Sequence, residues 1–187
     1  MITHTDIRDL SKYIKHLKSL SPEDKYSRFG YAASDYAIDQ FALQILYSES
    51  SHKLWYHSID DEITGWGHLV ESDNDVWELA VSVNSSKQRQ GIGNKLIIEM
   101  LEYAKFHNIH EVFMNCIEDN RVIQHLALKN NLKTKSRDNS ERTAIIEVSP
   151  PNFFEKNAHK LKEQTEILQE IAVLRNKLAE LWVNSFP

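Results

Sequence analysis

Apolar and polar residues alternate along three stretches in the middle of the chain, which is the pattern of half-buried strands. In the third stretch, for example, Leu79 and Val81 alternate with Glu78 and Ala80. Short runs of acidic, serine and asparagine residues separate the stretches and are typical of turns. We therefore predict an antiparallel meander of strands over residues 53–59, 65–71 and 76–83.

In the N-terminal third, apolar residues recur every three or four positions, as on the buried face of a helix. We predict a helix over residues 6–20 and further helices that begin after the capping residues Ser21 and Ser34. The last of these places Ile38, Ile45 and Leu46 on its buried face. Downstream, the pattern predicts a helix over 91–106, a strand over 111–117, a helix opening at 118–121, and strands over 132–135 and 142–148.

These elements predict an α/β fold with a mixed, mainly antiparallel sheet flanked by helices and followed by a long C-terminal helix. Pro150 and Pro151 end the last strand, because the residue before a proline avoids the helical conformation. We therefore divide the chain into a domain over residues 1–150 and an amphipathic helix over 151–187.

The C-terminal segment carries a short heptad seam. Its five apolar residues follow a 4-3-4-3 spacing: Ile167, Ile171, Leu174, Leu178 and Leu181. The seam either packs on its own domain or pairs with a second copy as a homodimer. About two heptads are too few to decide between these alternatives.

The composition of the 187-residue chain argues against some classes of binding partner. A net charge of -5 and the lack of a long Lys/Arg run argue against a nucleic-acid surface. No stretch reaches the ~18 to 20 apolar residues of a membrane span. The N-terminus also lacks the order of a signal peptide, so we expect a cytoplasmic protein without a membrane partner.

Cysteine and histidine usage indicates neither a disulfide nor a metal site. Cys116 is the one cysteine, and we expect it to pack within a strand. His107 and His110 are three positions apart, but they straddle a predicted helix end and strand start. No cysteine or carboxylate joins them at ligand spacing, so we predict no metal.

A polar loop with two glycines joins the third strand to the next helix. Gly91 and Gly93 let a ligand approach the backbone closely, beside the amides of the first helical turn. A dinucleotide fingerprint would require a third glycine where Leu96 stands, and a P-loop would require lysine where Asn94 stands. The loop therefore predicts a diphosphate site of another kind, with a plain tight corner as the alternative.

This loop resembles the acyl-CoA-binding signature of the GNAT acetyltransferases, Gln/Arg-x-x-Gly-x-Gly/Ala. The matching residues are Gln88, Arg89, Gln90, Gly91, Ile92 and Gly93. Asn120 stands where the family commonly has an asparagine that contacts the pantetheine arm. The segment over residues 20–24, with Arg28 and Phe29, is similar to the entry segment of bacterial protein-lysine acetyltransferases of the Pat type. The resemblance covers roughly residues 55–148.

The resemblance implies an acetyl-CoA-dependent N-acetyltransferase that moves an acetyl group to a primary amine within a ternary complex. The acceptor would be a small amine or a protein lysine. The backbone of Val81, Ser82 and Val83 would pair with the pantetheine arm as an added strand. Amides from Arg89 to Asn94 would bind the diphosphate.

Such a reaction needs a base, because an amine is mostly protonated at neutral pH. Glu78 is the best candidate, since it lies on the strand expected to carry the acyl end of CoA. The Pat-type enzymes that this sequence resembles have a glutamate at the matching position. His68 on the preceding strand is a second candidate, because imidazole titrates in the useful range.

One residue departs from the family pattern. Many GNATs have a tyrosine that protonates the leaving thiolate, but Ala127 stands at that position here. The thiolate would then leave unassisted or take its proton from the amine through water. The departure keeps a second hypothesis open, a non-catalytic acyl-CoA sensor or assembly module that acts through its C-terminal helix.

Overall fold

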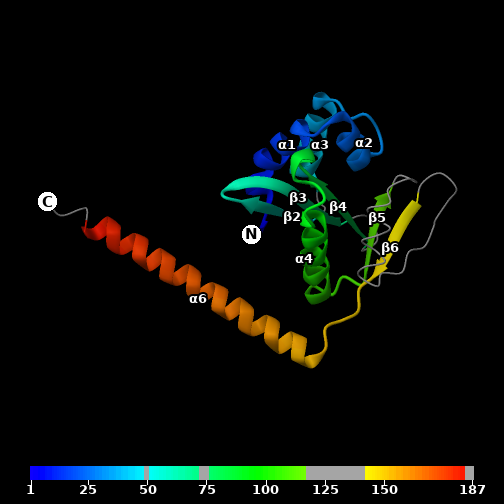
Figure 1. Cartoon of the computed structure of the whole chain (residues 1–187). Coiled ribbons are helices and arrows are strands. Elements are labelled where there is room, and N and C mark those ends of the chain that lie inside the picture. The colour runs from blue at the N-terminus through cyan, green and yellow to red at the C-terminus, as the bar shows by residue number, and fades with distance from the viewer. Residues whose placement is uncertain (49–50, 72–75, 117–141, 184–187) are drawn as a thin grey trace. The chain divides into compact units, whose positions relative to one another are not determined.

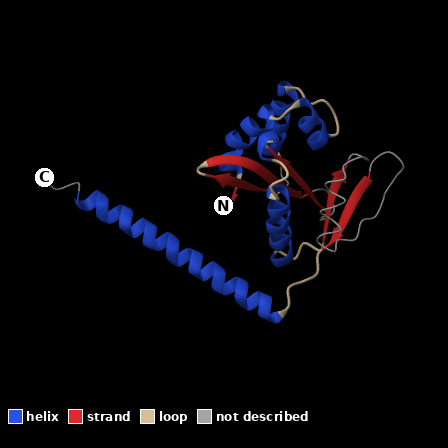
Figure 2. Ribbon diagram, viewed as in Figure 1, coloured by secondary structure: helices blue, strands red, loops and turns tan. Residues whose placement is uncertain are grey.

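The computed structural model describes residues 1–48, 51–71, 76–116 and 142–183. It divides into two compact units, residues 1–149 and residues 150–187. Figure 2 distinguishes the helices and strands of both. The elements of the first unit are β1 (Ile2–Thr5), α1 (Leu10–Ser19), α2 (Pro22–Phe29), α3 (Asp35–Tyr47), β2 (His52–Ile59), β3 (Glu62–Glu71), β4 (Trp77–Val83), α4 (Ile92–Phe106), β5 (Glu111–Cys116) and β6 (Arg142–Glu147).

The six strands of the described residues form one sheet in chain order, from β1 to β6 (Figure 1). All neighbouring strands are antiparallel except β4 and β5, which run parallel. The predicted meander of β2, β3 and β4 is confirmed, and so is the mixed, mainly antiparallel sheet. The sequence does not predict β1, because four residues are too few to show a period; this strand pairs with β2 from Ile2 to Thr5.

Helices α1, α2 and α3 lie on one face of the sheet (Figure 1). Buried residues of α1 and α3 form a core with Leu54 of β2 and Trp66 of β3, and the partly buried Phe29 of α2 packs against it. Leu17 of α1 and Ile38 of α3 are completely enclosed there. Burying an apolar side chain of this size contributes roughly 1.5–3 kcal/mol. This core fixes α1 and α2 above β3 and β4.

Helix α4 packs on the opposite face of the sheet, against Trp55, Leu69 and Leu79. Gly67 on β3 lies under this helix. A Cβ added at Gly67 would lie 2.8 Å from Cε of Met100, so the end of this flexible side chain would have to move. The position of α4 in turn fixes the loop that enters it from β4.

Two helix starts predicted from the sequence are confirmed by their caps. Oγ of Ser21 accepts a hydrogen bond from the amide of Asp24 at 3.1 Å. Oγ of Ser34 accepts one from the amide of Ala37 at 3.2 Å. Each bond satisfies an amide that the first turn of a helix leaves without a partner.

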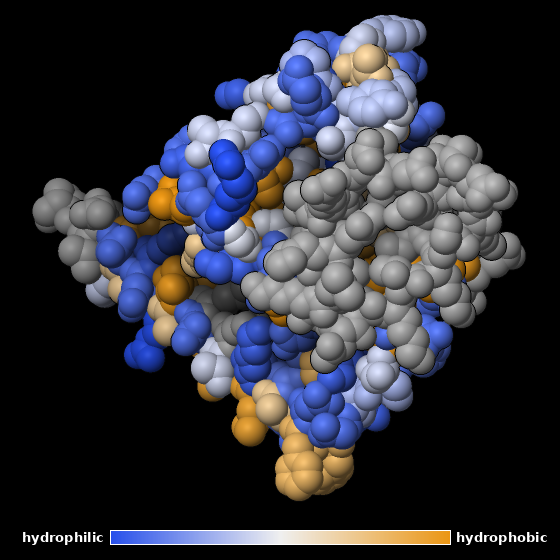
Figure 3. All heavy atoms as spheres, turned by 45° about the vertical axis from the view of Figure 1, so that its right-hand side comes forward, coloured by the Kyte–Doolittle hydropathy of each residue, from blue (hydrophilic) through white to orange (hydrophobic). Residues whose placement is uncertain are grey.

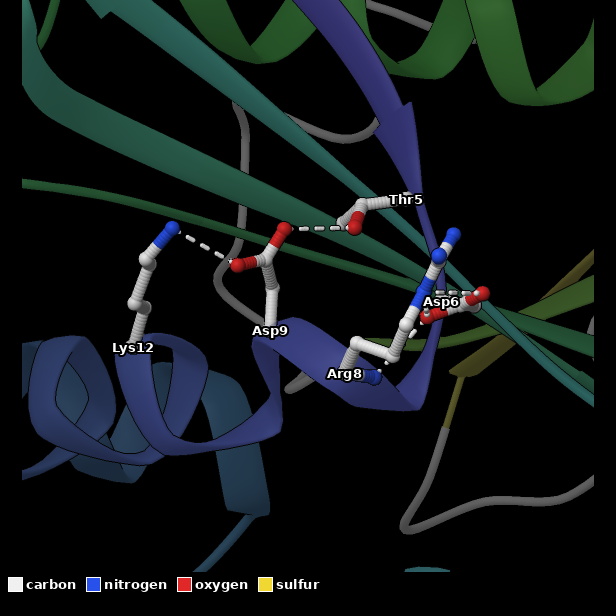
Figure 4. Close-up of polar contacts among 5 residues, drawn as sticks. All are labelled: Thr5, Asp6, Arg8, Asp9 and Lys12. Atoms are coloured by element: carbon white, nitrogen blue, oxygen red, sulfur yellow. Dashed lines mark hydrogen bonds and ion pairs between the residues drawn. The ribbon is translucent and has the colours of Figure 1, made fainter. Parts of the chain in front are cut away.

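A polar turn leads from β1 into α1 (Figure 4). Asp6 accepts a hydrogen bond from the amide of Arg8 at 2.8 Å and also pairs with its guanidinium. Oγ1 of Thr5 donates to Asp9 at 2.6 Å, and Nζ of Lys12 lies 2.7 Å from the other oxygen of Asp9. The predicted helix over residues 6–20 therefore consists of a 3-10 turn followed by α1.

Other predictions differ from the structure or lie outside it. Leu46 is 49% exposed, whereas Ile38 and Ile45 are buried, so the predicted apolar face of α3 was too wide. Strand β3 begins at Glu62, three residues before its predicted start. The predicted helix opening at 118–121 and the strand over 132–135 lie outside the described residues, and the side chain of Cys116 does too.

The second unit contains α6 (Phe153–Val183), the long C-terminal helix that the sequence predicts. A reciprocal cap begins it: the amide of Asn152 donates to Glu155 at 2.8 Å, and the amide of Glu155 donates to Asn152 at 2.9 Å. Each residue of the seam lies on this helix and is more than half exposed: Ile167, Ile171, Leu174, Leu178 and Leu181.

Hydrophilic residues cover most of the described surface on the side that Figure 3 shows, and the apolar patches between them are small. Among the described residues, no helix combines the length and the hydropathy that a membrane crossing requires.

Candidate functional site

The loop between β4 and α4 has a backbone suited to an anion. Arg89 has a φ of 61° and Gly91 a φ of 78°, both in the left-handed region. Left-handed residues in a short loop turn neighbouring amides to one side and make a concave anion site. Gly91 is the N-cap residue of α4, so the positive end of the helix dipole lies at the same loop. Gly91 makes no side-chain hydrogen bond to the amides of the first turn.

A carboxylate of α2 holds this loop in place. Nε2 of Gln88 donates to Asp24 at 2.8 Å, and Oγ of Ser85 donates to the other oxygen of Asp24. Nε2 of Gln88 also lies 3.3 Å from the carbonyl oxygen of Val83. The side chain of Gln88, predicted from the signature to bind the ligand, therefore braces the loop between α2 and β4.

The two edges of β4 differ. Along β3 the strand is paired over its whole length. Along β5 the parallel ladder, within the described residues, ends at the pair Glu78–Phe113. The backbone of Val81, Ser82 and Val83 lies beyond that end. A strand edge of this kind is a template for an extended ligand, as the sequence analysis expects for the pantetheine arm.

The strand edge and the loop meet at the start of α4. A Cβ added at Gly93 would lie 3.6 Å from Cγ1 of Val81 and 3.8 Å from Cγ2 of Val83. One at Gly91 would meet no described atom within 4 Å. The first turn of α4, with Ile92 and Asn94, therefore lies directly beside the predicted pantetheine edge.

Glu78 lies where β4 and β5 part. It is half-buried and stands opposite Val70 of β3. Trp77 and Leu79 pack on the α4 side of the sheet. Because side chains alternate along a strand, Glu78 faces the side covered by α1, α2 and α3. Glu78 therefore lies on the opposite face of the sheet from α4.

His68, the second candidate base, is deeply buried on the same face as Glu78. Its Nε2 lies 2.9 Å from Nδ1 of His52, and the two rings stack. Burial lowers the pKa of His68 well below its usual value, and the charge of Arg28 lowers it further. Such a histidine is neutral at pH 7 and a weak base, which favours Glu78 as the proton acceptor.

In the described part of the chain, no group of three potential metal ligands occurs.

His16 of α1 is a buried neighbour of β4 that the sequence does not single out. Its Nε2 lies 2.9 Å from Oγ of Ser82, which is itself buried. Burial lowers the pKa of His16 from 6.5 to about 4. The side chain of Ser82 therefore faces α1, and only its backbone is offered to a ligand at the strand edge.

The lowered pKa of His16 predicts a loss of stability in acid. Between pH 6.5 and pH 4 the unfolded chain binds a proton at this histidine that the folded chain does not, so the free energy of unfolding falls as the pH falls. At pH 5 the proton that the unfolded chain binds at His16 lowers the free energy of unfolding by roughly 2 kcal/mol. Urea unfolding at pH 7 and pH 5 should show a smaller acid loss for His16→Gln than for the wild type. The exposed His110→Gln serves as the control, and an equal loss in wild type and His16→Gln would contradict the prediction.

Several contributors to the site are missed by sequence reasoning. Asp24 bonds the loop after β4, His16 contacts Ser82 of β4, and the charge of Arg28 acts on His68 of β3. These interactions join residues far apart in the chain, so no local pattern reveals them. Asn120, predicted to contact pantetheine, lies outside the described residues. Ala127 does as well.

Comparison with known proteins identifies the fold. The family model described as Acetyltransferase (GNAT) family matches residues 14–131. No curated protein matches significantly. The chain is similar to the GNAT domain of S. lividans PAT, with 14% identity over 78% of this chain and 89% of that one, and a TM-score of 0.63.

Two further structures were solved with a bound ligand. Spermidine N-acetyltransferase from Vibrio cholerae, in complex with CoA and spermine, has 12% identity over 79% of this chain and 95% of that one, and a TM-score of 0.62. YncA, a putative acetyltransferase from Salmonella typhimurium with acetyl-CoA, has 11% identity over 81% of this chain and 95% of that one, and a TM-score of 0.58. Identities this low show a shared fold.

Proposed function

The chain belongs to the acetyltransferase (GNAT) family, and from this premise we propose that it transfers an acetyl group from acetyl-CoA to a primary amine. The observation that carries the proposal is the parting of β4 from β5 at Glu78, next to the loop that enters α4. The neighbours solved with CoA or acetyl-CoA support the choice of co-substrate. We place the activity in the cytoplasm.

The residues at this junction suit CoA. The left-handed turn at Arg89 and Gly91 and the first turn of α4 offer amides to the diphosphate. Beyond the ladder to β5, Val81, Ser82 and Val83 offer backbone groups to the pantetheine arm as an added strand. Asn120 remains a predicted contact of that arm.

Glu78 accepts the proton that the acceptor amine must lose before it attacks. The nitrogen–carbon bond to the acetyl group forms as the carbon–sulfur bond breaks, and CoA leaves as a thiolate that takes up a proton, through water since Ala127 replaces the usual tyrosine. Holding the reacting atoms about 3–3.5 Å apart removes much of the entropic barrier. An amide of β4 would stabilise the charge that develops on the carbonyl oxygen.

The test is free-thiol release from acetyl-CoA with a panel of amines, which includes small molecules and lysine-containing peptides. We expect release that depends on at least one amine, together with its acetylated product by mass spectrometry. Acetyl-CoA binding without release for any amine would contradict the proposed transferase.

That contradictory outcome is what the second candidate function predicts. The exposed apolar seam of α6 favours an acyl-CoA sensor or assembly module, because catalysis does not require such a seam. A sensor would bind acetyl-CoA without turnover, and binding would change the association of the chain with a partner.

We also propose that α6 pairs with a second copy through its seam. Replacing Leu174 and Leu178 with lysine places charges in the centre of the seam, so a homodimer should become a monomer in sedimentation analysis. Replacing the exposed polar residues Gln164 and Gln169 with lysine is the control. A wild-type chain that is already monomeric would instead support packing of the seam on its own domain.

A further inference from the structure

Arg28, in the last turn of α2, carries a positive charge that no described acid neutralises. Two other cations of this region are paired: Lys18 lies 2.7 Å from Asp39, and Lys25 lies 2.9 Å from Asp35. Arg28 has no ion pair among the described residues, and its Nε is buried without a hydrogen-bond partner. A buried polar or charged group without a partner destabilises the folded protein, because the group has lost its hydrogen bonds to water.

Aromatic rings hold the guanidinium in a fixed position. Its central carbon lies 5.1 Å from the ring centre of Phe29 and 5.9 Å from that of Phe41. Nη2 donates to the hydroxyl of Tyr13 at 3.0 Å. A guanidinium has five N–H donors, and the bond to Tyr13 is the one hydrogen bond that they make to the described residues. The two rings and Tyr13 restrict the position of the guanidinium, whose planar fork of N–H donors matches the geometry of a carboxylate.

The guanidinium lies on the same side of the sheet as Glu78. Phe41 and Tyr13 both contact the ring of His68, and His68 stands opposite Ala80 on β4. Ala80 is two residues from Glu78, which is roughly 7 Å along a strand. The neighbouring His52 adds a second buried atom without a partner, its Nε2. An unpaired cation and a nitrogen without a hydrogen-bond partner thus lie on the same face of the sheet as the proposed proton acceptor.

We propose that Arg28 binds a carboxylate of the acceptor, so the acceptor is an amine that also carries a carboxylate, as free amino acids do, and not a polyamine. This inference rests on the proposed acetyl transfer. The carboxylate would pair with the guanidinium while the amine lies at Glu78. A polyamine would instead bring further positive charge towards Arg28, which like-charge repulsion opposes.

The test compares amines that differ by a carboxylate: lysine with cadaverine, and phenylalanine with 2-phenylethylamine. We measure kcat/KM by free-thiol release. A charge-assisted pair with arginine should make the wild type prefer each carboxylated amine by about tenfold or more. Arg28→Gln should reduce this ratio to near one, mainly through KM, and Arg28→Lys should restore part of it because it keeps the charge.

The control is Arg8→Gln, which removes an exposed arginine paired with Asp6 in the turn before α1 and should leave the ratio unchanged. Thermal unfolding shows whether each variant folds. A preference for cadaverine, or equal ratios in wild type and Arg28→Gln, would overturn the proposal.

If no amine is turned over, the proposed function fails, and calorimetry of lysine and cadaverine with the CoA-saturated protein separates the two claims. Lysine binding that is lost in Arg28→Gln would support the carboxylate site alone. The absence of lysine binding to the wild type would overturn that site too.

Discussion

Replacing Glu78 with glutamine is expected to lower kcat for acetyl transfer by about 100- to 10,000-fold, the usual share of a general base. Glutamine keeps the size and much of the hydrogen bonding of the side chain but cannot accept the proton of the amine. Glu78 lies at the last pair of the β4–β5 ladder, beside and not within the predicted CoA edge. The affinity for acetyl-CoA should therefore change little, as calorimetry can show.

Glu71→Gln is the matched control for this experiment. Glu71 lies on the neighbouring strand β3 but stands opposite Trp77, whose side chain packs on the α4 side. Its replacement should leave turnover intact. Equal turnover of Glu78→Gln and the wild type would remove Glu78 from the mechanism and leave the family fold without an identified base.

Replacing Gly91 with glutamate is expected to weaken acetyl-CoA binding by at least about tenfold, since a like charge within ~4 Å costs roughly 1–4 kcal/mol at moderate dielectric. The new carboxylate would lie at the amides proposed to bind the diphosphate. A side chain at a φ of 78° also strains the loop. Calorimetric titration with acetyl-CoA measures the loss.

Gly30→Glu separates the two causes. Gly30 also has a φ of 78°, and a Cβ added there would also meet nothing within 4 Å, but it ends α2 and lies outside the loop. It introduces the same charge and similar strain at a different place. Equal acetyl-CoA affinities for the two variants would show that Gly91 is no part of the binding site.

Local signals account for what the sequence predicts well. The caps at Ser21 and Ser34 and the alternation along β4 each depend on residues a few positions apart, and the structure has helices and a strand at these places. The exposure of Leu46 was not predictable, because periodicity gives the direction of an apolar face but not how much of it a neighbouring helix covers.

The site itself is only partly readable from the sequence. The signature locates the loop because one contiguous segment forms it. By contrast, the brace from Asp24 to Gln88, the His16–Ser82 contact and the position of Arg28 over Phe41 depend on how α1, α2 and α3 pack on the sheet. Such contacts between distant segments leave no periodic trace in the sequence.

The most direct test of the account is calorimetric titration of the wild-type protein with acetyl-CoA, free CoA and ATP. A diphosphate loop joined to a pantetheine edge predicts that acetyl-CoA and CoA bind with similar affinity and ATP much more weakly, because ATP lacks the arm that would pair with β4. If neither acetyl-CoA nor CoA binds, or if ATP binds as tightly as both, the acetyl-CoA site proposed at β4 and α4 is wrong.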